Sequence, residues 1–191
     1  MPLTLPTYDL AQLTPLLSAF ISLNDIRAQV LLTAPSGDRY KQQVFTLGLE
    51  NLNQGIAAAT PVGSRFLAMR NGLAVAADLT EPAANTAPKV ASISSGTPVH
   101  QAIDAIPLIQ RLPDVQNAAY ELVTLQIPGV LTECYWVKLI NGANHLFVPY
   151  LSLNKKLRLR EPLPWPAFLQ AIQPVAQKNL AFYATDMARV K

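Results

Sequence analysis

The segment 131–160 constrains the fold of this chain more than any other part of the sequence. It reads LTECYWVKLINGANHLFVPYLSLNKKLRLR, in which two partly alternating apolar runs flank an Asn141-Gly142 pair. Alternation of apolar and polar residues is typical of strands, and Asn-Gly supplies the positive φ that a tight hairpin turn requires. The segment therefore predicts a β-hairpin followed by a short basic tail.

A second hairpin is predicted around Asn71-Gly72, because the apolar runs 65–69 and 73–79 flank this pair. Further strands are predicted at 27–33, 40–49, 89–94 and 120–127, where apolar or alternating runs are bounded by turn residues. Each half of the chain thus contains an Asn-Gly hairpin and a helix. The two halves match in element type but not in residues, so an internal duplication is the less favoured interpretation.

Helices are predicted where apolar residues recur at spacings of three and four. One covers about 8–23 with Asp9 as its cap, one opens at Thr97-Pro98, and one begins near Trp165. Each contains an internal proline, which predicts a kink or a shorter helix. Together these elements predict an α+β fold, with a mainly antiparallel sheet of five to eight strands and about three helices covering one face.

A chain of 191 residues, of which 50% are hydrophobic and 14% charged, is long and apolar enough for one core. We predict a single α+β domain over 1–191, with 80–98 as the candidate junction between two subdomains. Neither half alone has an obviously complete core. The predicted core comprises Leu13, Leu17, Phe20, Val30, Leu32, Phe66, Leu73, Val75, Ile103, Ile106, Leu122, Leu125, Trp136, Val137, Phe147, Val148, Phe168 and Ile172.

The number of cysteines and the length of the apolar runs help to predict the cellular location of the protein. Cys134 is the single cysteine, which excludes an internal disulfide and a cysteine-based zinc site. The apolar N-terminal run has no basic residue before Arg27, so we interpret it as a helix, with an export signal as the alternative. No apolar stretch reaches the roughly 20 residues that a membrane span requires. We predict a soluble, cytoplasmic protein without integral membrane association.

The sequence contains no recognisable catalytic constellation. Cys134 and His145 lie on opposite arms of the predicted hairpin, but its turn places Cys134 opposite 147–150, several residues from His145. His100 and Asp104 are one helical turn apart, a spacing that is common by chance, and a cationic histidine is disfavoured at a helix N-terminus. Neither a glycine-rich phosphate loop nor a metal-ligand spacing is present. We therefore predict no catalytic residue, no cofactor and no metal site.

The basic tail is the best candidate for a binding surface. Five basic residues and one acidic residue lie in 131–160, so this segment carries the whole positive excess of a chain whose net charge is +3. In a strand its cations would point to one side and its leucines to the other. An edge strand protected by charge against aggregation is the alternative interpretation. The candidate binding residues are Lys155, Lys156, Arg158, Arg160, Trp136 and Trp165, the tryptophans as stacking platforms.

Three functions are compatible with these observations. A non-enzymatic protein-interaction or assembly module is favoured, because the chain is apolar, poor in charge and without a catalytic constellation. Its partner would be another protein or a second copy of the chain. The first alternative is a hydrolase-type enzyme whose site residues are dispersed in sequence. The second is nucleic-acid binding through a basic edge strand at 155–160, for which a net charge of +3 is weak.

Overall fold

A computed structural model describes residues 6–80, 87–140 and 144–189, with the backbone alone for 183–189. Within these residues an eight-stranded sheet has the strand order β4-β3-β2-β1-β5-β6-β7-β8. The strands are β1 Arg39–Thr46, β2 Thr60–Arg70, β3 Leu73–Thr80, β4 Val90–Ser95, β5 Tyr120–Ile127, β6 Thr132–Leu139, β7 Leu146–Ser152 and β8 Leu163–Pro164. The α-helices are α1 Leu10–Ser22, α2 Ile26–Thr33, α3 Thr97–Gln110, α4 Pro113–Gln116 and α5 Trp165–Arg189.

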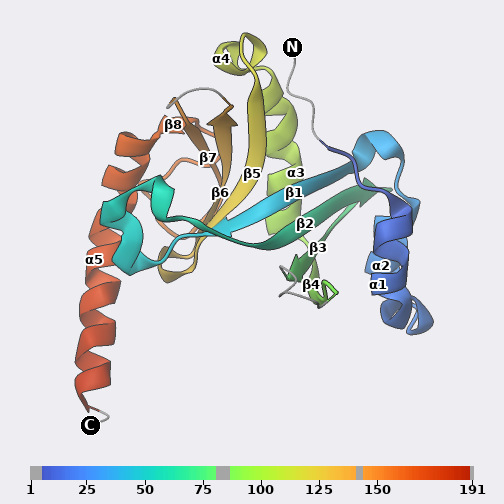
Figure 1. The fold of residues 1–191 in the computed structure, drawn as a ribbon, viewed down its shortest axis with the longest axis horizontal. Coiled ribbons are helices and arrows are strands. Elements are labelled where there is room, and N and C mark those ends of the chain that lie inside the picture. Colours follow the sequence, from blue (N-terminus) through green and yellow to red (C-terminus); the bar gives the residue numbers. More distant parts are fainter. Residues whose placement is uncertain (1–5, 81–86, 141–143, 190–191) are drawn as a thin grey trace.

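Each half of the chain contributes a four-stranded antiparallel meander to this sheet (Figure 1). Among the described strands, β1 and β5 form the one parallel pair, with Val44 opposite Thr124. A parallel neighbour requires a crossover rather than a tight turn, and the chain between β4 and β5 supplies it with α3. The predicted fold class, α+β with a mainly antiparallel sheet, is confirmed.

Helices cover both faces of the sheet, whereas the sequence analysis placed them on one. Figure 1 shows α5 and the α1–α2 pair at opposite ends of the sheet, with α3 between them. Along β2, Phe66 and Ala68 pack in the α1–α2 cluster, while Leu67 packs against α3. Because successive strand residues point to opposite faces, α3 must lie on the other side. Phe45 and Leu125 join the α5 cluster on the same side as α1 and α2.

The prediction of a strand at 27–33 is wrong, since this run forms α2. The Asp25 side chain accepts a hydrogen bond from the Arg27 backbone N–H and caps the helix. The helix buries Ala28, Val30 and Leu31 against the sheet. A short apolar run is compatible with a buried strand or a buried helix, and periodicity alone does not separate them.

The two predicted hairpins are both present. Asn71 and Gly72 have φ values of 50° and 75°, as a type I′ turn between β2 and β3 requires. The predicted Asn141-Gly142 turn lies outside the described residues, but the arms β6 and β7 pair on either side of it. Cys134 lies opposite Pro149, within the range expected from the sequence.

Proline does not interrupt the three longest helices at the predicted points. Pro15, Pro107 and Pro174 lie inside α1, α3 and α5, and each is exposed on its helix. Each proline lacks a backbone N–H but lies on the solvent side of its helix, so the apolar face stays intact. The free energy gained by burying that face outweighs the loss of one hydrogen bond. Among the described helices, none combines the length and the apolarity needed to cross a membrane.

The predicted core is largely confirmed. All of its members are buried except Phe20, Leu32 and Leu73, which are partly buried and pack against the α1–α2 cluster. The core divides into three clusters, two on the α1–α2–α5 face and one under α3. The apolar cluster under α3 covers only part of that face of the sheet, and polar side chains occupy the rest.

Candidate functional site

The sheet face that carries α3 has a covered end and an open end. At the covered end, apolar side chains such as Leu67, Ala76 and Val148 pack beneath α3 residues that include Ile106. At the open end, beyond the first turns of α3, the same strands carry polar side chains. These open-end residues are Arg65, Asp78, Gln126, Glu133 and Tyr150.

Arg65 is the centre of the open end, and its side chain connects two carboxylates. Its Nε donates to Asp78 Oδ1 at 2.7 Å and its Nη2 donates to Oδ2 at 3.0 Å. Its Nη1 donates to Glu133 Oε2 at 2.6 Å and to the Tyr150 hydroxyl at 2.9 Å. One guanidinium thus pairs with two carboxylates, which leaves the cluster with an excess of negative charge.

Two further hydrogen bonds hold Glu133 in place. The Tyr150 hydroxyl donates to Glu133 Oε2 at 2.9 Å, and Gln126 Nε2 donates to Glu133 Oε1 at 3.0 Å. Strand register explains this convergence, because Arg65 faces Asp78 and Gln126 faces Glu133 across neighbouring strands. Cross-strand partners point to the same side of a sheet, so one residue from each of β2, β3, β5, β6 and β7 reaches the cluster.

Burial and charge act in opposite directions on the ionisation of this cluster. Arg65 is only 7% exposed, and burial by itself would lower the pKa of its guanidinium. Interaction with Tyr150, Asp78 and Glu133 instead raises the Arg65 pKa well above its ordinary value. Burial raises the pKa of Tyr150 well above its usual range, so its hydroxyl stays protonated and can donate. The cluster is therefore a stable ion-paired network.

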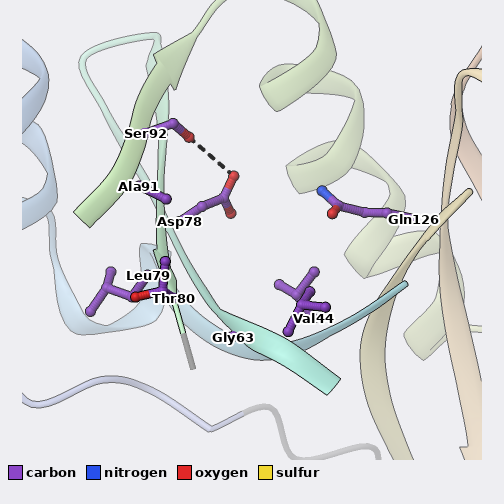
Figure 2. A pocket seen from close by; sticks show the side chains of 9 residues that line it. Val44, Gly63, Asp78, Leu79, Thr80, Ala91, Ser92 and Gln126 are labelled. Carbon is purple, nitrogen blue, oxygen red and sulfur yellow. Dashed lines mark hydrogen bonds between the residues drawn. The ribbon is translucent and has the colours of Figure 1, made fainter. Parts of the chain in front are cut away.

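A cavity of about 220 Å³ lies beside this cluster (Figure 2). Val44 and Gly63 form its floor, and the side chains of Asp78 and Gln126 extend toward one another from opposite sides. Ser92 donates to Asp78 Oδ2 at 3.3 Å on the β4 side. Gly63 has no side chain to fill this space, so the backbone of β2 is left as the floor. A ligand here would meet one carboxylate, that of Asp78, and the Gln126 amide in an otherwise mainly apolar lining.

Two further cavities adjoin the same network. One of about 80 Å³ is lined by Arg65, Glu133, Tyr150 and the first turns of α3. We call this cavity and the 220 Å³ cavity together the acidic hollow, because Glu133 lines the first and Asp78 lines the second. The other, of about 410 Å³, is lined mainly by apolar side chains and shares Gln126 with the acidic hollow. Its apolar lining, Pro128, Leu131, Leu151 and Leu153, is called the apolar patch.

Two leucines of the apolar patch are largely exposed. Leu131 is 59% exposed and Leu153 is 71% exposed, and the Leu153 backbone N–H donates to the Leu131 carbonyl at 3.4 Å. Leu131 has φ 48° and ψ 50°, a left-handed conformation that is rare for a leucine. Large apolar side chains held side by side at the surface favour contact with another molecule.

The predicted basic edge strand at 155–160 is wrong, since these residues form turns after β7. Strand β8 pairs with β7 and occupies the place beside it. The Asn154 side chain accepts from the Lys156 backbone N–H at 3.0 Å and donates to the Ala171 carbonyl at 2.8 Å, which shapes the turn. Leu157 is buried in the α5 cluster and anchors it. We call residues 155–160 the basic turn.

The four cations of the basic turn differ in their partners. Arg160 Nη2 lies 3.1 Å from Asp104 Oδ2 of α3, and Arg158 Nε lies 3.8 Å from Glu161 Oε2. Lys155 and Lys156 are exposed. The positive charge predicted for this segment thus lies on a protruding turn rather than along a strand edge.

The two candidate tryptophans lie on the other face of the sheet. Trp136 is 7% exposed, and its ring lies 6.2 Å from that of Phe147, which in turn lies 5.1 Å from that of Trp165. The structure therefore brings Trp136 and Trp165 into one aromatic cluster. That cluster is part of the core beneath α5, so the Trp136 ring is closed to base stacking.

The residues considered for acid–base or nucleophilic chemistry remain apart. Cys134 is fully buried, and burial raises the pKa of its thiol well above the ordinary value. His145 contacts Trp136 edge-on, with the ring centroids 5.5 Å apart, and burial and the nearby Lys138 lower its pKa. Asp104 forms its ion pair with Arg160. Within the described residues, no group of three or more His, Cys, Asp or Glu side chains is arranged to hold a metal ion.

The sequence analysis missed the open-end residues. Arg65 is 13 residues from Asp78 and 68 residues from Glu133 along the chain, so no local pattern connects them. Two signals were present, since Arg65 and Asp78 are charged residues inside apolar strands and Gly63 interrupts the strand that contains Arg65.

Comparison with known proteins gave no matching family model, no similar curated protein and no similar solved structure. Function must therefore be argued from the geometry itself.

Proposed function

We propose that this chain is a non-enzymatic protein-interaction module and that its contact surface is the open end of the α3 face. The observation that carries the proposal is the exposed apolar patch beside the acidic hollow. Leu131 and Leu153 supply apolar area, while Asp78 and Glu133 supply charge. Protein interfaces combine an apolar centre with a polar rim in this way.

The chemistry of the hollow favours a partner with a cationic side chain. The side chains of Asp78 and Glu133 are 25% and 22% exposed, so part of each side chain remains accessible beside Arg65. A lysine or arginine flanked by apolar residues would place its charge in the hollow and its neighbours on the apolar patch. Such electrostatic complementarity gives specificity and fast association.

The two alternative functions have less support. A hydrolase would need a free acid or base, but both carboxylates in the acidic hollow are paired with Arg65. A nucleic-acid binder would need its cations beside exposed aromatic rings, but the basic turn lies over a buried Trp136 cluster. We further propose a cytoplasmic location, for which the single buried thiol of Cys134 is compatible support.

Site-specific photo-crosslinking in the native cell tests the proposed function. A photoreactive amino acid is placed at position 131 or 153, and its products are identified by mass spectrometry. Position 23 is the matched control, because Leu23 is 78% exposed but lies at the end of α1. We expect a defined protein adduct from 131 and 153 and none from 23. The absence of an adduct at both patch positions would overturn the proposal.

A further inference from the structure

The sheet face that carries α1, α2 and α5 is uncovered along its middle. Its two apolar clusters pack under α1 and α2 at one end and under α5 at the other. Between them runs β1, which has strands on both sides, yet its Gln43 side chain is exposed. Alternate residues of a strand share a face, so Arg39 and Lys41 lie on the same side as Gln43. The uncovered strip therefore carries two partly exposed cations.

Neither of these cations has a carboxylate partner. The ion pairs found within the described residues include neither Arg39 nor Lys41. The Arg39 guanidinium carbon lies 5.5 Å from the centroid of the Tyr8 ring, and Lys41 Nζ lies 5.5 Å from that of Phe66. Nε and Nη1 of Arg39 are buried without a hydrogen-bond partner among the described residues. The rings hold both charges in place without neutralising them, so a positive potential remains.

A cavity of about 300 Å³ lies beside Lys41, between α1 and the strands β1, β2 and β3. Its lining consists of the apolar Leu16, Phe66, Leu79 and Pro88, the uncharged polar Gln12, Ser64 and Thr80, and Lys41. We call it the Lys41 cavity, because Lys41 is the one charged residue among the described residues that line it. Pockets for small molecules typically have volumes of roughly 300–1,000 Å³ and a mainly apolar lining with a few polar groups.

We propose that the Lys41 cavity binds a small organic anion. The carboxylate or phosphate group of this ligand pairs with Lys41, and its apolar body lies against Phe66 and Leu79. An ammonium group is a point charge with three donors, so it pairs with either anionic group. The Ser64 hydroxyl and the Gln12 amide also line the cavity and can donate to the anion. This site is separate from the protein contact proposed for the open end.

The charges on this face favour an anion over a cation. Arg39 adds a second positive charge two residues from Lys41, and Glu121 on the neighbouring strand is already paired with Lys138 at 3.1 Å. The neighbouring 220 Å³ cavity has the opposite sign, because Asp78 is the one charged residue among the described residues that line it. An anion should therefore select the Lys41 cavity, although the two cavities share part of their lining at the end of β3.

Chemical shifts of the backbone amides test the proposal. Phenylacetate and phenyl phosphate are the probes, phenylacetamide is the uncharged counterpart, and inorganic phosphate is the anion without an apolar body. We expect both probes to shift the amides of Lys41 and Ser64, and the tighter probe identifies the preferred anionic group. Phenylacetamide and inorganic phosphate should each bind more weakly by about fivefold or more, since each lacks one of the two contacts.

Three outcomes of this titration would overturn the proposal. The first is the absence of shifts with either probe, and the second is equal binding of phenylacetamide or inorganic phosphate. The third is a set of shifts confined to Ser92 and Gln126, which line the 220 Å³ cavity and not the Lys41 cavity.

Two variants test the residues that are assigned to the site. Lys41→Met keeps the length of the side chain and removes its charge, so the affinity for phenylacetate should fall about tenfold. Lys178→Met, at an exposed position on α5, is the matched control and should bind like the parent chain. Gln12→Trp places an indole at the cavity from an exposed position on α1 and should abolish binding without lowering the melting temperature. Its control is Ser18→Trp, at an exposed position of α1 outside the cavity. Unchanged binding in Lys41→Met or in Gln12→Trp would overturn the assignment.

Discussion

Two neighbouring cross-strand pairs on β2 and β3 divide the α3 face. Leu67 and Ala76 pair beneath α3, and Arg65 and Asp78 form the next pair on the same side of the same strands. The first pair is apolar because α3 excludes water from it. The second pair lies at the N-terminal end of α3, where Arg65 and the first turns of the helix line a small cavity, and here polar side chains form an ion-paired network. We therefore expect stability to depend mainly on the covered end, and we propose that recognition takes place at the open end.

The largest effect is expected from a cavity at the covered end. Ile106 is fully buried under α3, so Ile106→Ala should lower the free energy of unfolding by about 2–5 kcal/mol. Urea denaturation measures this change. Leu108→Ala on the same helix is the control, since Leu108 is 40% exposed and the loss should stay within about 0.5 kcal/mol. Similar losses for the two variants would contradict the packing described for α3.

A smaller loss is expected from removal of the central cation at the open end. Arg65→Ala leaves Asp78 and Glu133 close together without their counter-charge. We expect a loss of roughly 2–3 kcal/mol, below the roughly 3–5 kcal/mol of a fully buried pair, because both carboxylates are partly exposed. Arg70→Ala, at an exposed arginine on the same strand, is the control for thermal denaturation. An equal shift of the two melting temperatures would argue against the network.

Buried Tyr150 should make the free energy of unfolding depend on pH in the alkaline range. Burial raises the pKa values of Tyr150 and Tyr135, so the folded chain keeps protons that the unfolded chain releases above about pH 10. The unfolded state then binds fewer protons, and the free energy of unfolding falls as pH rises through 10. Tyr150→Phe should cost about 1 kcal/mol at neutral pH and make this alkaline decline shallower. Denaturation between pH 8 and 11 checks both, and an unchanged slope would contradict the assignment.

The smallest change in stability is expected when the open end is made to resemble the covered end. Replacement of a buried ion-paired group by apolar residues of similar volume is often neutral or stabilising. The triple variant Arg65→Met, Asp78→Leu, Glu133→Met should therefore unfold at a denaturant concentration equal to or above that of the parent chain. Its photo-crosslinking at position 153 should nevertheless be lost. Retained crosslinking would show that the charges of the hollow are not needed for recognition.

Local sequence patterns predicted much of the fold and little of the site. Alternation identified β5 to the residue, because a half-buried strand displays its two faces at every second position. The Asn71-Gly72 turn was predicted because few residue pairs adopt positive φ. The run 27–33 was assigned wrongly, because a short apolar segment has no distinct period. The alternating pattern of 155–160 predicts a strand where the structure has a turn, because the sequence does not show that β8 occupies the place beside β7.

Apolar segments, tight turns and the concentration of positive charge can all be predicted from the amino-acid sequence alone. These properties depend on neighbouring residues and on backbone preferences, which are local. Folding alone brings Arg65 to Glu133 across 68 residues, and places Leu131 and Leu153 together beside them. Such contacts depend on strand order and register over the whole sheet. The physical reason is that burial and charge pairing act between residues that are close in space, whatever their separation along the chain.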